Sequence, residues 1–267
     1  MMEFHSSSDP CQHTPANHQV AGTTSKVSPW LSPLAYLLGR HCLLPLFFGQ
    51  IRITGQKNIP TTGPVILAPT HRARWDALLV PYATADCRRE QDLRFMVTID
   101  ECQGLQGWFV KRLGGFPVNS KHPSIRTLRH GVELLQQKKT LVIFPEGNIF
   151  RDGQVHQLKP GIARLALSAE SSHSGLGVKI IPIGINYSQP YPNWGTDVSI
   201  DIGCPIRVAD YMSGCIKHDA KSITTDLGKV LQQLSHQETK STNHAFAEIT
   251  NSRSPQGLGV AHQGDLS

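Results

Sequence analysis

The apolar residues divide the chain into a folded region with a polar segment at each end. Residues 1–28 are rich in Ser, Thr, His, Gln and Pro and carry no apolar period, and residues 237–267 are again polar and irregular. Such segments cannot bury enough apolar surface to offset the entropy of ordering them. We therefore predict a disordered leader over 1–28, a folded domain over 29–236 and a disordered tail over 237–267.

Within the folded region, short apolar runs alternate with amphipathic segments. The runs predict strands at 51–53, 65–68, 93–97, 116–118, 141–144, 178–187 and 198–202. The amphipathic segments predict helices at 77–85, 105–113, 124–139, 160–168 and 224–235. This alternation is typical of an α/β domain, and we predict a single mixed, mostly parallel sheet flanked by helices. Ligands of such sheets bind at the carboxyl ends of the strands.

The first part of the folded region is strongly apolar from Trp30 to Phe48. Arg40 and His41 lie at the centre of this stretch, and a charged side chain in the middle of a bilayer costs roughly 3 kcal/mol. We therefore expect one or two helices over 29–49 that lie in the membrane interface, with Trp30 and Tyr36 among the lipid head groups. The alternative is a helix packed on its own domain.

Composition adds a preference for anionic partners. The 267 residues carry a formal net charge of +6 and a sequence pI of about 9.1, which favours lipid head groups, phosphorylated substrates, an acidic carrier protein or nucleic acid. No run of aromatic residues interleaved with Lys and Arg indicates nucleic acid. The six cysteines are scattered and the first ten residues lack an apolar stretch, so we expect reduced thiols in a protein that stays inside the cell.

A histidine and a carboxylate, His71 and Asp76, follow the apolar run that ends at Ala68. Five residues of helix turn through about 500° and would point the two side chains apart. If His71 lies on the loop and Asp76 in the first turn of the next helix, the two can meet. A carboxylate that accepts the proton of one imidazole nitrogen leaves the other nitrogen as a base. With 13 histidines in the chain, a structural or surface role is the alternative for this pair taken alone.

A second polar group follows another predicted strand, in the sequence F-P-E-G-N-I-F-R. Gly147 permits a turn that other residues resist, so Glu146 and Arg151 could reach the same sheet edge as the histidine. An arginine can hold a phosphate in a bidentate fork, and Lys159 and Arg112 would add positive charge. The alternative is a surface turn in which Glu146 and Arg151 pair with each other.

Together these blocks resemble the glycerophospholipid acyltransferase family, the group that contains the 1-acylglycerol-3-phosphate acyltransferases. The first block of the family, H-x-x-x-x-D, is matched by His71 and Asp76. The third block, F-P-E-G followed by an arginine, is matched by 144–147 and Arg151. The fourth, a short apolar strand containing proline, is matched by 180–185.

The second block departs from the family pattern. The family has a glycine, an aromatic-apolar pair and then an arginine that helps bind the phosphate of the acceptor. Residues 115–118 align with this block, but Ser120 stands where the arginine is usual. Lys121 or Arg112 could substitute, although an ammonium group is not a bidentate fork. Because of this departure, the acceptor could be lysophosphatidate or another lysophospholipid or hydroxylated lipid.

The resemblance implies a reaction and its components. His71 would deprotonate the acceptor hydroxyl while Asp76 holds the imidazole, and Arg151, Glu146 and Gly147 would position the glycerol phosphate. The donor would be acyl-CoA or an acidic acyl-carrier protein, with no metal or other cofactor. The expected reaction acylates 1-acyl-sn-glycerol-3-phosphate to phosphatidate, in a peripheral or monotopic protein on the cytoplasmic side of a membrane.

The residues themselves are also compatible with two other classes of protein. A metal-dependent phosphoesterase would use His71, Asp76 and Glu146 as ligands. A non-enzymatic, basic lipid- or nucleic-acid-binding module would not depend on His71 at all.

Overall fold

The computed structural model describes residue 28 and residues 31–84, 93–99, 104–119, 124–173 and 175–252. The strands in this part of the chain are β1 (Ile51–Thr54), β2 (Val65–Pro69), β3 (Leu93–Thr98), β4 (Gly115–Val118), β5 (Thr140–Val142), β6 (Lys179–Tyr187), β7 (Val198–Ile202) and β8 (Ile206–Arg207). The helices are α1 (Leu31–Leu38), α2 (Leu44–Phe47), α3 (Asp76–Thr84), α4 (Gly104–Arg112), α5 (Ile125–Gln136), α6 (Gly161–Ser172) and α7 (Ile216–Ser252).

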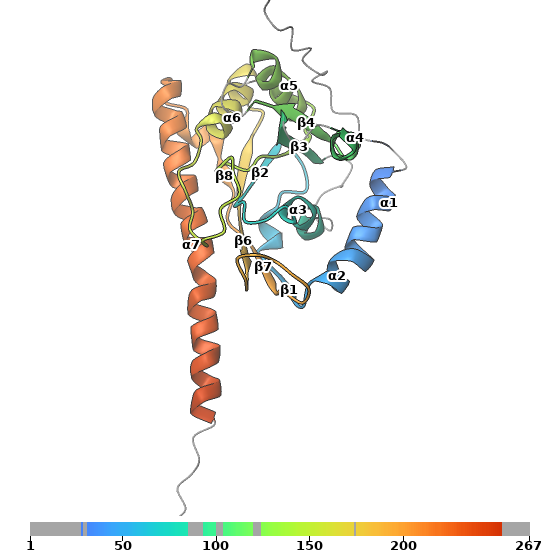
Figure 1. Ribbon diagram of the computed structural model, residues 1–267. Coiled ribbons are helices and arrows are strands. Elements are labelled where there is room, and N and C mark those ends of the chain that lie inside the picture. The colour runs from blue at the N-terminus through green and yellow to red at the C-terminus, as the bar shows by residue number, and fades with distance from the viewer. Residues whose placement is uncertain are drawn as a thin grey trace, which may run out of the picture.

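The described strands form one sheet in the order β1-β7-β6-β2-β5-β3-β4, with β8 paired to β6 (Figure 1). β2 is parallel to β5 and β6, and β3 is parallel to β4 and β5. β7 is antiparallel to β6, and β1 is parallel to β7. The predicted mixed, mostly parallel sheet flanked by helices is confirmed. Because β2, β5 and β6 are parallel, the loops that follow them leave the sheet at one edge.

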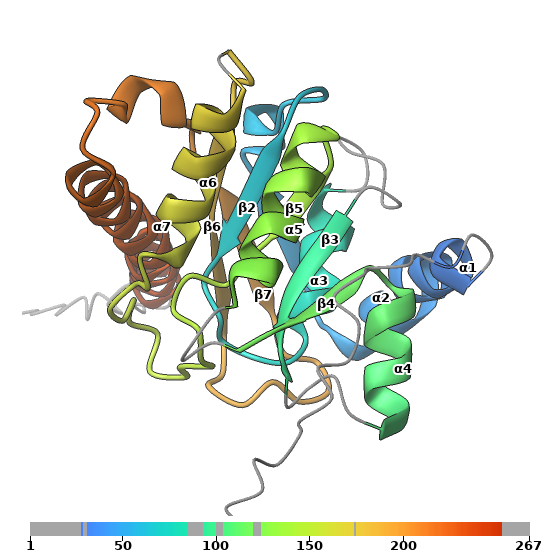
Figure 2. The same ribbon diagram turned by 90° about the horizontal axis from the view of Figure 1, so that it is seen from above.

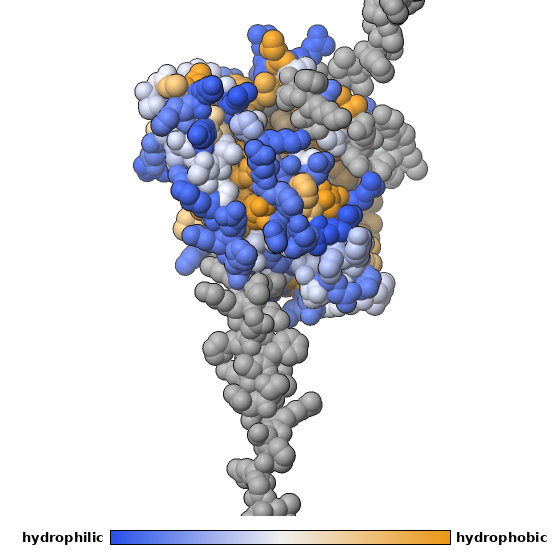
Figure 3. Space-filling view, turned by 60° about the vertical axis from the view of Figure 1, so that its left-hand side comes forward, coloured by the Kyte–Doolittle hydropathy of each residue, from blue (hydrophilic) through white to orange (hydrophobic). Residues whose placement is uncertain are grey.

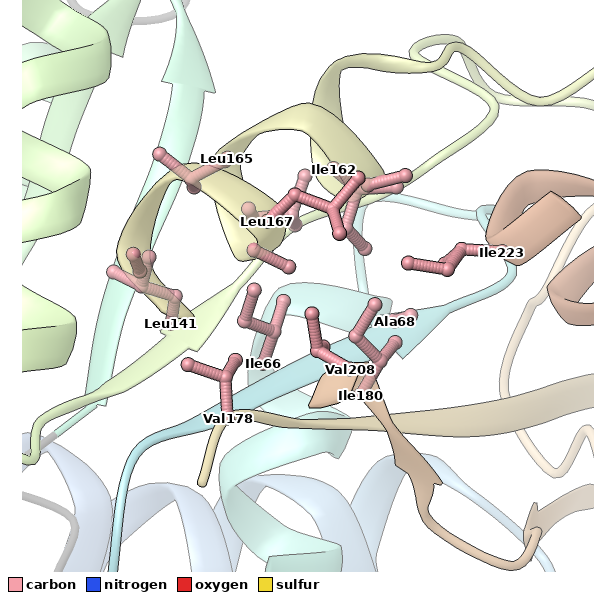
Figure 4. Close-up of a cluster of buried hydrophobic side chains, with 14 of the residues drawn as sticks. Ile66, Ala68, Leu141, Ile162, Leu165, Leu167, Val178, Ile180, Val208 and Ile223 are labelled. Carbon is pink, nitrogen blue, oxygen red and sulfur yellow. The ribbon is translucent and has the colours of Figure 1, made fainter. Parts of the chain in front are cut away.

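Helices cover both faces of the sheet. Figure 2 shows α7, α6 and α5 side by side on one face, with α3 and the α1–α2 segment on the other side. Side chains alternate across a strand, so Ile66 of β2 and Ile180 of β6 face α6 and α7 (Figure 4), while Leu67 and Ile181 belong to the core under α2 and α3. Both cores need apolar side chains from the same strands, which explains the uninterrupted apolar runs in the sequence.

The N-terminal apolar stretch is helical, as predicted. A π-helical turn over Gly39–Leu43 joins α1 to α2. Tyr36 is buried, so its predicted place among lipid head groups is wrong, because this side chain packs inward. Five leucines of the segment are nevertheless 45% or more exposed: Leu34, Leu37, Leu38, Leu43 and Leu46. None of the helices in the described ranges combines the length and hydropathy that crossing a bilayer requires.

The last helix is longer than the sequence pattern indicated. α7 begins at Ile216 and ends at Ser252, whereas we predicted a helix over 224–235 and a disordered tail from residue 237. The apolar period fades after Ser235, yet residues 216–252 contain a single glycine and no proline, so nothing in the sequence breaks the helix. Figure 1 shows the end of α7 extending past the rest of the domain.

Candidate active site

His71 and Asp76 meet at the carboxyl edge of the sheet. His71 lies on the loop that leaves β2, and Asp76 is the first residue of α3, as the sequence predicted. The Nδ1 atom of His71 is 2.9 Å from Oδ2 of Asp76, and the imidazole stacks on the ring of Phe144 with centroids 4.0 Å apart. The histidine side chain is 19% exposed and the aspartate side chain is fully buried. With Nδ1–H donating to the carboxylate, Nε2 remains as the basic nitrogen.

Four donors hold the Asp76 carboxylate. Oδ2 accepts from the backbone N–H groups of Arg72 (2.6 Å) and Ala73 (2.9 Å) as well as from His71, and Oδ1 accepts from the hydroxyl of Tyr187 at 2.6 Å. Burial, followed by the charge of Asp76, raises the pKa of Tyr187, so the hydroxyl stays protonated and donates. These donors fix the orientation of the Asp76 carboxylate beside His71.

Sequence reasoning missed Tyr187. Tyr187 is the last residue of β6, the strand next to β2 in the sheet. A tyrosine at the carboxyl end of a predicted buried strand was the available clue, but only the strand order shows that it reaches Asp76.

Glu146 is buried and its carboxylate is bound by donors of the protein itself, so it faces inward rather than toward a substrate as the sequence suggested. The residue is 2% exposed. Its Oε2 accepts from the backbone N–H of His71 (3.0 Å) and from Nη1 of Arg72 (2.8 Å), and its Oε1 accepts from the backbone N–H of His156 (2.9 Å). Glu146 also forms no pair with Arg151, because its ion-pair partner is Arg72. Glu146 instead joins the loop after β5 to the loop that carries His71.

The turn at Gly147 brings Lys159 to the same edge. Gly147 has φ +73°, and a Cβ atom there would lie 2.7 Å from both Cε and Nζ of Lys159. The backbone N–H of Lys159 donates to the carbonyl of Pro145 at 2.8 Å. Glycine is therefore favoured by its positive φ, and the predicted pair Gly147 and Lys159 is close in space.

Arg151 stands on the rim of this edge. The preceding residue, Phe150, donates its backbone N–H to the carbonyl of His71 at 2.9 Å. The Arg151 side chain is exposed and its guanidinium lies 5.1 Å from the ring centroid of Tyr191, in the loop after β6. An exposed guanidinium one residue from a backbone contact with His71 is suitable for a phosphate.

The two other cations predicted to bind substrate are Arg112 and Lys121. Arg112 ends α4, which precedes β4, and its guanidinium stacks over Trp108 at 4.3 Å. Since Arg112 precedes β4, it lies at the amino end of that strand. Because β4 is parallel to β3, β3 to β5 and β5 to β2, this end is opposite the edge that carries His71. The prediction that Arg112 binds substrate is wrong for that topological reason. Ser120 and Lys121 lie outside the described residues.

An aromatic cluster connects the N-terminal helices to the catalytic pair. Phe47 of α2 stacks on Trp75, the residue before Asp76, with ring centroids 4.3 Å apart. The ring centroids of Phe48 and Tyr187 are 6.1 Å apart, and so are those of Phe47 and Trp194. An apolar wall of the edge is thus continuous with the segment that exposes the five leucines.

The donor set also bears on the metal hypothesis. Within the described ranges, no three His, Cys, Asp or Glu side chains are grouped as metal ligands. The oxygens of Asp76 and Glu146 point at N–H and O–H donors rather than at a shared point. The edge therefore presents an oriented base, and the chemistry it supports is deprotonation of a hydroxyl.

Comparison with known proteins agrees with this chemistry. The profile of the Acyltransferase family matches residues 50–186, about half of the chain and both motif-bearing loops. Glycerol-3-phosphate acyltransferase 1, mitochondrial, of Mus musculus is 30% identical over 163 residues, which are 54% of this chain and 19% of that protein. The 1-acyl-sn-glycerol-3-phosphate acyltransferase of Streptococcus pneumoniae is 25% identical over 151 residues, 54% of this chain and 51% of the relative.

A solved structure shares the fold. The crystal structure of the 1-acyl-sn-glycerophosphate acyltransferase PlsC from Thermotoga maritima superposes with a TM-score of 0.56 at 20% identity, over 76% of this chain and 78% of that one. This chain thus spans about a fifth of the mouse relative and about half of the pneumococcal one. The match to the family profile shows that the chain belongs to the acyltransferase family, among the glycerophospholipid acyltransferases whose motifs it carries.

Proposed function

We propose that this protein transfers a fatty acyl chain from an acyl thioester to the free hydroxyl of 1-acyl-sn-glycerol-3-phosphate, giving phosphatidate. The observation that carries the proposal is the 2.9 Å contact between His71 and Asp76 at the carboxyl edge of the sheet. Arg151 and Lys159 are the cations placed to attract the acceptor phosphate.

The reaction follows from the geometry of the pair. Nε2 of His71 takes the proton of the acceptor hydroxyl as its oxygen attacks the thioester carbonyl. The tetrahedral intermediate collapses, the new ester forms, and the C–S bond breaks to release a thiolate. The imidazolium, stabilised by Asp76, returns the proton to the sulfur. The proton balance closes without a metal, a redox step or an acyl-enzyme.

The acceptor is proposed to be a lipid because apolar surface adjoins the base. Phe47 and Trp194 extend the wall of the site toward the exposed leucines of the α1–α2 segment. A helix that presents leucines to solvent gains free energy by lying in a membrane interface. We propose peripheral or monotopic attachment to the cytoplasmic side of a membrane through this segment.

The relatives favour a second candidate acceptor. The mouse relative is named for glycerol 3-phosphate, a water-soluble acceptor, while the pneumococcal relative is named for its 1-acyl derivative. Both molecules offer a hydroxyl near a phosphate, so the same base and cations could serve either.

An acceptor panel separates these candidates. The purified full-length chain is given an acyl-CoA or an acyl-carrier protein and, in turn, lysophosphatidate, glycerol 3-phosphate, lysophosphatidylcholine and lysophosphatidylethanolamine, with products identified by mass spectrometry. The proposal predicts the highest kcat/KM with lysophosphatidate and unchanged rates with a chelator. A preference for glycerol 3-phosphate would establish the second candidate, and a rate that depends on added metal would contradict the mechanism.

A further inference from the structure

A groove of about 600 Å³ lies on the face of the sheet opposite the α1–α2 segment. One wall is α7, and the other is the segment that runs from His156 to Pro160 and into α6. The floor includes Leu158 and Ala220, which belong to the core under α6 and α7. Figure 3, which brings this side of the molecule forward, shows apolar patches among a largely hydrophilic surface.

The lining of the groove is cationic. Arg164 of α6 and Lys217, Lys221 and Lys229 of α7 contribute to it, and no aspartate or glutamate does. Lys229 pairs with Asp226 at 3.0 Å. The other three cations form no ion pair with the described residues and are exposed. Three unneutralised charges around a concavity attract an anion more strongly than the same charges spread over a convex surface.

The groove leads toward the catalytic edge. His156, in its wall, donates its backbone N–H to Glu146, and Glu146 accepts from the backbone N–H of His71. Gln232 also lines the groove, two residues before Leu234, whose carbonyl accepts from Asn186 near the end of β6. One end of the groove thus lies beside the loops that carry the base, and Lys217 is at the other end of the lined stretch of α7.

We propose that this groove binds the phosphorylated nucleotide of coenzyme A, so that the donor is an acyl-CoA. The inference rests on the proposed function, which requires an acyl thioester. A groove of this volume, open to solvent along one side, has room for an extended small molecule. Its apolar floor suits a nucleotide base, its cations suit phosphates, and its direction leads the thioester arm toward His71. An acidic carrier protein would instead require a broad basic surface outside the concavity.

Direct binding of free coenzyme A to the full-length chain tests the proposal, because it needs no turnover. Isothermal titration at low ionic strength compares wild type with the double variant Lys217→Gln/Lys221→Gln. The matched control is Lys57→Gln/Lys138→Gln, which removes the same charge from two exposed lysines at the other edge of the sheet. We expect Kd to rise about tenfold in the groove variant, to change less than about twofold in the control, and to rise with salt in wild type.

Kinetics add a second readout. With palmitoyl-CoA as donor, KM rises in the groove variant while kcat is retained. Coenzyme A affinity that is equal in the groove variant and the control would overturn the proposal, as would a wild type that uses only acyl-carrier protein. The two proposals fail separately: if wild type binds coenzyme A through the groove but transfers no acyl group, the proposed function fails and the nucleotide site stands.

Discussion

At the scale of single residues, the chemistry depends on how firmly one carboxylate is held. Asp76 receives hydrogen bonds from two backbone N–H groups, from His71 and from Tyr187. The first three donors are within five residues of the aspartate, whereas Tyr187 comes from another strand. The backbone donors fix the carboxylate on its own loop, and Tyr187 fixes that loop to the sheet.

Removing the tyrosine hydroxyl therefore weakens catalysis without removing the base. In Tyr187→Phe the ring stays in place against Phe48, but one of the four donors to Asp76 is lost. We expect kcat to fall about tenfold, equivalent to about 1.4 kcal/mol, while the KM values for donor and acceptor stay within about twofold of wild type.

Tyr211→Phe is the matched control, because Tyr211 donates to Asp226 at 3.1 Å away from the catalytic edge. Both variants lose one tyrosine–aspartate hydrogen bond, so a general loss of stability would affect both. Equal kcat values in the two variants would show that Tyr187 does not position Asp76.

The residue scale also shows what the sequence could predict. His71 and Asp76 are five positions apart, so local backbone geometry decides whether they meet. Glu146 and Arg72 are 74 positions apart, and the sequence does not show that one side chain turns inward toward the other. Asp76 and Glu146 both follow strands. Only the fold shows that Asp76 orients the base, whereas Glu146 connects two loops inside the protein.

At the scale of elements, Glu146 connects the loops after β2 and β5. It neutralises Arg72, which is itself 4% exposed, and it accepts from two backbone N–H groups. A buried ion pair adds little stability compared with a well-packed apolar pair, but breaking it leaves a buried charge without a partner.

Glu146→Gln should therefore act on stability before it acts on substrate binding. We expect the free energy of unfolding to fall by about 3 to 5 kcal/mol, measured by urea denaturation with an unchanged m value. Glu133→Gln is the control, since that glutamate is exposed and contacts His130 at 3.8 Å, and its loss should cost less than about 1 kcal/mol. An unaltered urea midpoint together with a raised KM for the acceptor would restore the original prediction that Glu146 binds substrate.

The elements themselves were predictable where a local pattern specifies them. β2 and β6 are long uninterrupted apolar runs, and α3 begins at a carboxylate that suits a helix start. β8 has two residues, too few to show any period. The extension of α7 beyond Ser235 was missed because its side chains lose the apolar repeat while its backbone meets no breaker.

At the scale of the whole molecule, the surfaces proposed for the two substrates lie on different faces of one sheet. The exposed leucines and the aromatic cluster lie with α2 and α3, while the cationic groove lies with α6 and α7. The loops after β2, β5 and β6 are the edge common to both faces. With this arrangement the proposed lipid acceptor and the proposed thioester donor would meet at His71.

The proposed membrane contact of the α1–α2 segment predicts a specific loss of lipid binding. Leu37 and Leu46 are 57% and 64% exposed, and replacing both with asparagine removes apolar area that a bilayer interface would bury. We expect flotation with phosphatidylcholine–phosphatidylglycerol vesicles to weaken by about tenfold or more. Ile125→Asn/Met212→Asn, also exposed but on the opposite face, should bind vesicles like wild type. Equal flotation of the two double variants would exclude the segment as the membrane contact.

The proposed role of His71 as the base of an acyl transfer is tested by the kcat of His71→Ala with an acyl-CoA and lysophosphatidate. The control is His173→Ala, at an exposed histidine after α6. We expect His71→Ala to lower kcat by about a thousandfold while keeping the urea midpoint and coenzyme A affinity of wild type, and His173→Ala to change none of these quantities. A His71→Ala protein that retains more than about a tenth of the wild-type kcat would contradict this role.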